Sequence, residues 1–90
     1  MACHSTPDPQ VLVIGAGIAG LTAAFVLQQR GVSVRVLEST ARVGGRMTTD
    51  LVGGRVIDRG AQFLSTGYPM LSSLVRRLGL SSEWVRTTPW

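Results

Sequence analysis

The sequence predicts an α/β fold, because a strand, a helix and a second strand follow one another near its start. Val11–Ile14 is a continuous run of β-branched and aliphatic residues, which is typical of a parallel strand buried on both faces. Over Ile18–Arg30 the apolar residues recur at helical spacing until Gly31 ends the helix. Val32–Glu38 alternates apolar and polar residues and closes a βαβ unit with parallel strands.

The rest of the chain predicts smaller elements. Thr48–Val52 and Arg55–Asp58 flank a Gly-Gly pair, which indicates a β-hairpin, since glycine tolerates the positive φ angles of such turns. Tyr68–Leu78 has apolar residues at helical spacing and predicts a second helix. Glu83–Thr87 is predicted to be one more strand. Residues 1–10 are polar and contain two prolines, so we expect a flexible tail.

Composition and charge argue against several classes of partner and indicate where in the cell we expect the chain. The net charge is +4, yet the nine arginines are spread along the chain with only one adjacent pair, so we expect no nucleic-acid partner. Cys3 is the only cysteine, which excludes an internal disulfide and leaves too few ligands for a structural metal site. The run Val11–Leu27 has no charge, but three glycines interrupt it and no positive segment precedes it. We therefore expect a cytoplasmic chain without a membrane span.

The turn between the first strand and the first helix matches Gly-x-Gly-x-x-Gly. The first glycine permits a sharp turn, the second lets the backbone approach a pyrophosphate, and the third lets helix and strand pack closely. An anion then lies against free N–H groups at the helix N-terminus. The motif predicts a Rossmann-type dinucleotide-binding unit whose contact residues are Gly15, Gly17, Ile18, Ala19 and Gly20.

Glu38 ends the second strand eighteen residues after Gly20. An acidic side chain at this place accepts hydrogen bonds from the adenosine ribose hydroxyls and disfavours a 2′-phosphate, which argues against NADP. NAD and FAD both remain open at this point.

A second glycine segment, Arg-Val-Gly-Gly-Arg-Met-Thr-Thr, spans residues 42–49. Gly44 and Gly45 lie between Arg42 and Arg46, so bare backbone and two guanidinium groups can meet the same polyanion from a second side. An NAD dehydrogenase has no general need for this feature.

The glycine turn, the glutamate and Arg-x-Gly-Gly-Arg-x-x-Thr together resemble the flavin-containing amine oxidase superfamily. That group includes monoamine and polyamine oxidases, protoporphyrinogen oxidase, carotenoid desaturases and renalase-like proteins. The resemblance implies FAD as the cofactor, with the glycine turn and the glutamate on its ADP half and the Gly-Gly segment along it, the arginines near the pyrophosphate. It assigns these roles to Gly15, Gly17, Gly20, Glu38, Arg42, Gly44, Gly45 and Arg46.

Residues 58–63, Asp-Arg-Gly-Ala-Gln-Phe, resemble the next landmark of that family, which passes close to the isoalloxazine ring. Gly60, Ala61 and Gln62 are accordingly expected at the cofactor, although an ordinary turn after a strand explains the same residues. No catalytic constellation is visible, as expected where the cofactor carries the hydride chemistry.

The resemblance runs from Val11 to about Thr87 but covers only the first part of the family's architecture. We therefore expect residues 11–90 to form a partial FAD/NAD(P)-binding domain, an incomplete N-terminal part of a larger flavoprotein fold without its substrate domain. The predicted function is the FAD-binding segment of an oxidoreductase that takes a hydride equivalent from a C–N or C–C bond and needs the missing C-terminal part. Two alternatives stay open: a truncated, catalytically inactive fragment, and the nucleotide-binding domain of an NAD-dependent dehydrogenase.

Overall fold

A computed structural model of the chain describes residues 8–61, 63–65 and 67–87. Most of the expected tail therefore lies outside the described residues. Gln10, at its end, is held in place: its N–H donates to the Ser33 carbonyl oxygen and its side-chain oxygen accepts from the Ser33 N–H, both at 3.0 Å. The last residue of the expected tail is thus hydrogen-bonded to the residue just before the second strand.

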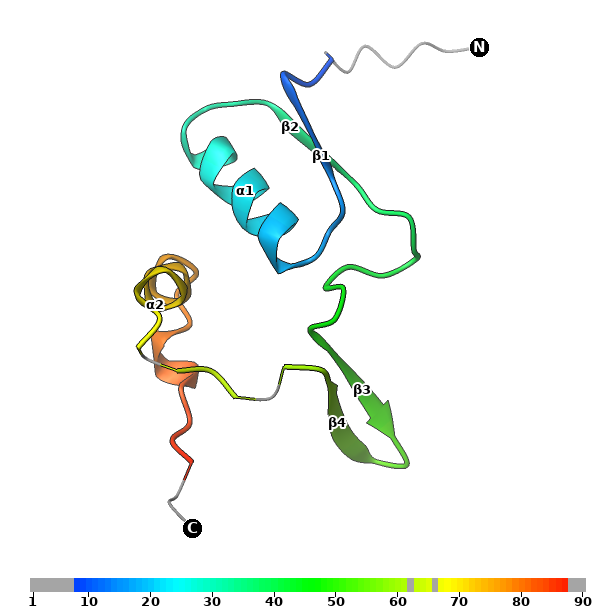
Figure 1. Ribbon diagram of the computed structural model, residues 1–90, viewed down its shortest axis with the longest axis vertical. Helices are drawn as coiled ribbons and strands as arrows, with labels where there is room; N and C mark the ends of the chain where they lie inside the picture. Colours follow the sequence, from blue (N-terminus) through cyan, green and yellow to red (C-terminus); the bar gives the residue numbers. More distant parts are fainter. Residues whose placement is uncertain (1–7, 62, 66, 88–90) are drawn as a thin grey trace.

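The predicted βαβ unit is present. Strands β1 (Val11–Ile14) and β2 (Val34–Leu37) are parallel, in a register that pairs the first residues of both strands and the last residues of both. Helix α1 (Ile18–Gln29) connects them and lies along one side of the pair (Figure 1). Gly31 adopts a φ of +81° and its N–H donates to the Gln28 carbonyl oxygen, which ends the helix as expected.

The predicted hairpin is also present, and its second strand is one residue longer than expected. Strands β3 (Thr48–Val52) and β4 (Arg55–Arg59) are antiparallel. Gly53 and Gly54 have φ angles of +57° and +77°, so both central positions of the turn require residues that tolerate positive φ. The hairpin extends away from the βαβ unit (Figure 1).

The C-terminal part of the chain forms the predicted helix but not the predicted strand. The second helix is α2 (Pro69–Arg77), slightly shorter than its apolar pattern. The strand predicted over Glu83–Thr87 is wrong: η1 (Ser81–Glu83) is a turn of 3₁₀ helix, and residues 84–87 have no regular secondary structure. A strand requires a neighbour for its backbone N–H and C=O groups, and no described strand lies alongside this segment.

Burial differs from the expected two-sided core. Side chains along β1 alternate, and Leu12 and Ile14 are 55% and 77% exposed. The expectation that β1 is buried on both faces is thus wrong for the described chain, because α1 covers one face and no described element covers the other. Only Ala16 is buried among the described residues. The radius of gyration is 16.7 Å, whereas a compact chain of this length has about 12 Å.

Candidate dinucleotide-binding site

Two of the three motif glycines are required by the described chain itself, and the third is not. Gly15 adopts a φ of +97°, which lets the chain turn sharply out of β1. A Cβ at Gly20 would overlap the Gly15 carbonyl oxygen and crowd Val13, so only glycine lets α1 pack this close to the strand. A Cβ at Gly17 would meet no atom within 4 Å, so nothing in the described chain requires glycine there. The open side of Gly17 is where the motif predicts close approach of a pyrophosphate.

The N-terminus of α1 presents unpaired backbone donors. Gly17 is the N-cap residue, and its carbonyl oxygen accepts from the Leu21 N–H at 3.0 Å. Within the described chain no acceptor is found for the N–H groups of Ile18, Ala19 and Gly20, as helix geometry dictates for a first turn. The first turn also contains no acidic residue. These donors and the helix dipole favour an anion at this end.

An open cavity of about 360 Å³ lies at this turn. Its wall consists of Ile14, Gly15, Gly17, Ile18, Ala19, Gly20, Gly44, Arg46 and Met47. The cavity therefore joins both glycine segments that the sequence singled out, together with one of the two flanking arginines.

Glu38, which follows β2, links the end of this strand to the glycine turn through a hydrogen bond. Its Oε1 accepts from the Ala16 N–H at 2.8 Å, and its Oε2 accepts from the N–H and the hydroxyl of Thr40 at 2.9 and 2.7 Å. These hydrogen bonds, the one from Ala16 first, lower the pKa of Glu38 from 4.5 to about 2. Three of about four acceptor positions of the carboxylate are used, so it retains capacity for a ribose hydroxyl. That contact stays a prediction.

The Gly44–Gly45 segment packs across the turn. The Gly44 N–H donates to the Ala16 carbonyl oxygen at 2.7 Å. A Cβ at Gly45 would lie 3.5 Å from the Cα of Gly17, and Gly45 itself has a φ of +58°. The two glycine segments are thus in contact, so the second forms another wall beside the first.

Ala16 is the residue that sequence reasoning missed. It is 1% exposed, its N–H is bound by Glu38 and its carbonyl oxygen by Gly44. Both later segments therefore bind the backbone of one residue of the turn, one at its N–H and the other at its C=O. Its contribution comes from the backbone, which side-chain type does not report; the small residue between two glycines was the only signal.

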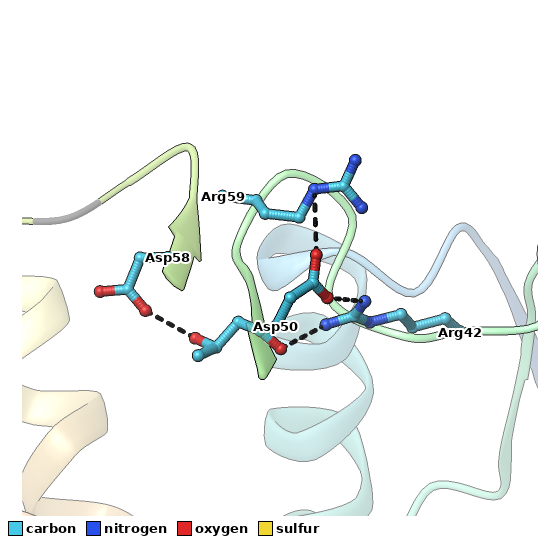
Figure 2. Close-up of polar contacts among 5 residues, drawn as sticks. Arg42, Asp50, Asp58 and Arg59 are labelled. Atoms are coloured by element: carbon cyan, nitrogen blue, oxygen red, sulfur yellow. Dashed lines mark hydrogen bonds and ion pairs between the residues drawn. The ribbon is translucent and has the colours of Figure 1, made fainter. Parts of the chain in front are cut away.

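The two arginines of the second glycine segment lie in different surroundings. The Arg42 guanidinium binds the hairpin: its Nη1 is 2.6 Å from Asp50 Oδ1, and its Nη2 donates to the Thr49 carbonyl oxygen at 2.8 Å (Figure 2). This hydrogen bond holds the pKa of Asp50 below its usual value. Arg46 instead lines the cavity at the turn. Contact of either arginine with a cofactor stays a prediction.

The residues expected at the flavin ring are partly described. Gly60 has a φ of +94°, and a Cβ there would overlap the Arg46 carbonyl oxygen. Gly60 and Arg46 also share a second open cavity of about 390 Å³, beyond the first. Ala61 is exposed, and Gln62 lies outside the described residues. Their place beside a ring stays a prediction.

Among the described residues, no three His, Cys, Asp or Glu side chains gather in a way that could hold a metal ion. In the same part of the chain, no helix has the length and apolar character needed to cross a membrane.

Comparison with known proteins gives a consistent set of relatives. Residues 18–89 match the profile of a family described as flavin containing amine oxidoreductase. A probable polyamine oxidase 4 of Arabidopsis thaliana is 47% identical, with 90% of this chain and 17% of that protein covered. Protoporphyrinogen oxidase 2 of the same plant is 41% identical over 82% of this chain and 15% of its own length.

A solved structure supports the same relationship. Wild-type putrescine oxidase bound to putrescine aligns with a TM-score of 0.74 and 44% identity, covering 79% of this chain and 16% of that one. The chain therefore spans about one sixth of the length of these relatives.

Proposed function

This chain belongs to the flavin containing amine oxidoreductase family, and we propose that it holds the ADP half of FAD within an amine-oxidising flavoenzyme. Family membership confirms the resemblance inferred from the sequence, and it confirms FAD as the cofactor over NAD.

The open face of Gly17 carries the proposal. Gly17 lines a cavity that is also lined by Arg46 and by the first residues of α1, whose N–H groups have no acceptor in the described chain, an arrangement suited to a diphosphate. Glu38, charged at neutral pH and anchored to the turn, would accept from the adenosine ribose. Gly44 and Gly45 would lie along the cofactor, and Gly60, Ala61 and Gln62 near its ring.

The chemistry that the bound flavin would supply is the uptake of a hydride equivalent as a C–N bond of the substrate is oxidised. The protein would bind and orient the flavin and the substrate. The polyamine and putrescine oxidases among the relatives support an amine as substrate. Oxidation of a C–C bond is the second candidate, since a protoporphyrinogen oxidase is 41% identical.

We further propose that residues 11–90 act as a partial cofactor domain. The relatives are about six times longer, which supports a requirement for further protein segments to enclose the ring and bind substrate. A cytoplasmic location is part of the proposal, and the single cysteine supports it.

The test is an FAD titration of the full ninety-residue chain against Gly17→Val. Gly17 has a φ of −81° and open space at its Cβ, so valine fits the folded backbone while it projects into the pyrophosphate path. We expect saturable flavin binding by the wild type and at least about a tenfold loss in the variant, a change of about 1.4 kcal/mol.

Gly67→Val is the control away from the turn, because Gly67 lies outside both cavities. A Cβ there would lie 3.2 Å from Ser65 Oγ, so the fold of this variant is checked as well. It should bind FAD like the wild type. Equal FAD affinity of Gly17→Val and the control, with both folded by circular dichroism, would refute the assignment of the turn.

A further inference from the structure

We propose that Arg42 is a positioning residue that acts on the cofactor through the loop it belongs to, with Asp50 as its anchor. The pair would hold Gly44 and Gly45 against the glycine turn and so keep the second wall of the cradle in place. The inference rests on the proposed function, since it assigns this loop to FAD.

The contacts show that Arg42 is already engaged by protein acceptors. Both of its terminal nitrogens reach β3, one to the Asp50 carboxylate at 2.6 Å and the other to the Thr49 carbonyl oxygen at 2.8 Å. Paired planar contacts of this kind specify orientation as well as attraction. The start of the loop is therefore tied to the middle of the hairpin.

Asp50 is itself held from a second side. Arg59 Nε lies 3.4 Å from its other carboxylate oxygen, and Figure 2 shows the two arginines approaching Asp50 from different directions. Across the hairpin, the Thr49 hydroxyl donates to Asp58 Oδ1 at 2.7 Å. Asp50, which binds Arg42, is thus itself held by a second ion pair, and a side-chain hydrogen bond connects the two strands of its hairpin.

The far end of the tied segment is the contact with the turn. Gly44 follows Arg42 by two residues, and its N–H binds the Ala16 carbonyl oxygen at 2.7 Å. A shift of the loop away from the turn would weaken this hydrogen bond. The Asp50 charge also offsets that of Arg42, whereas Arg46 lines the cavity and has no ion pair within the described residues. Arg46 is therefore the better candidate for direct attraction of a phosphate.

The sign of one substitution separates a positioning role from a direct one. Asp50→Asn removes a negative charge near the cradle and releases Arg42, so direct binding of Arg42 to the pyrophosphate predicts tighter FAD binding. The positioning role predicts weaker binding, by about two- to fivefold, the range that a partly exposed ion pair supports. Arg42→Gln should weaken binding similarly, and the double variant no further, because the two residues act as one unit.

Two measurements on the full chain complete the test. FAD affinity is compared with that of Glu83→Gln, which removes the same charge outside the site, and amide exchange is followed by NMR without flavin. We expect Asp50→Asn to speed exchange of the Gly44 N–H and to leave the Leu21 N–H, bonded to Gly17, unchanged.

Weaker FAD binding together with faster Gly44 exchange supports the inference. Tighter or unchanged FAD binding overturns it, even if Gly44 exchanges faster. If the wild type binds no FAD, the proposed function fails, and unchanged Gly44 exchange in Asp50→Asn would independently show that the ion pair does not hold the loop.

Discussion

At the scale of single residues, the site depends on backbone groups that charged side chains hold in place. Glu38 is the clearest case, because its carboxylate binds the Ala16 and Thr40 N–H groups before any ligand is considered. The negative charge strengthens these bonds, since a carboxylate accepts them more strongly than a carboxylic acid. The residue that is expected to recognise the ribose therefore also shapes the turn.

This arrangement predicts a pH dependence. The pKa of Glu38 is lowered from 4.5 to about 2 in the folded chain, so its stabilising contribution is complete above pH 4.5 and is lost as the pH falls through about 2. We expect the difference in stability between wild type and Glu38→Gln to be constant near neutral pH and to shrink between pH 4.5 and 2. Urea midpoints at each pH measure it. A Glu38 titration midpoint near 4.5 by carboxyl NMR would contradict it.

The structural roles of Gly15 and Gly20 were predictable from the sequence, because the sharp turn and the close packing of helix on strand follow from the local path of the chain. The space beside Gly17 is open, and approach of a pyrophosphate there stays a prediction. The pairing of Arg42 with Asp50 was not predictable, because it depends on where the hairpin lies relative to the loop. Composition cannot distinguish an arginine that reaches a ligand from one that reaches a neighbouring strand.

At the scale of elements, short sequence patterns correctly predicted the helix and the hairpin that short-range hydrogen bonds hold together. Helix α1 and the hairpin appear where periodicity and glycine pairs indicated, since their hydrogen bonds close within the element or with an adjacent strand. The strand expected over Glu83–Thr87 failed, because strand formation depends on a partner that apolar alternation does not guarantee.

The hairpin turn gives a prediction of its own. Gly53→Asn should stabilise the chain by about 0.4 to 1 kcal/mol, since Asn tolerates the φ of +57° and has fewer unfolded conformations than glycine. Gly53→Val should destabilise it, because a β-branched residue is strained at positive φ. Thermal unfolding followed by circular dichroism compares the two. A lower midpoint for the Asn variant would argue against this turn.

At the scale of the whole molecule, the described chain has one covered and one uncovered face on its parallel sheet. Leu12 is 55% exposed on the uncovered face, whereas Val13 is half-buried and lies close to Gly20 of α1. The alternation is that of a sheet with one partner layer. The uninterrupted apolar run Val11–Ile14 predicted two partner layers, one on each face. Such a run cannot by itself reveal which layers are present.

The difference in exposure between Leu12 and Val13 predicts that the smaller truncation costs more stability. Leu12→Ala should change stability by less than about 0.5 kcal/mol, as for a surface site, although a Leu→Ala change in a core costs about 2 to 5 kcal/mol. Val13→Ala removes fewer atoms and should cost more. Denaturant unfolding of both variants provides the comparison. A large loss for Leu12→Ala would mean that this face is covered in solution, for instance by a second copy of the chain.

Ala16 has a consequence for how such turns are found in databases of sequences. Its methyl group is enclosed and both of its peptide groups are occupied, so the second letter of the motif is restricted in size here. A search pattern that accepts any amino acid at that letter admits many sequences whose side chain is too large for this buried position. Restricting the letter to small amino acids, and requiring an acid and a Gly-Gly pair downstream, would turn a frequent coincidence into a selective signature.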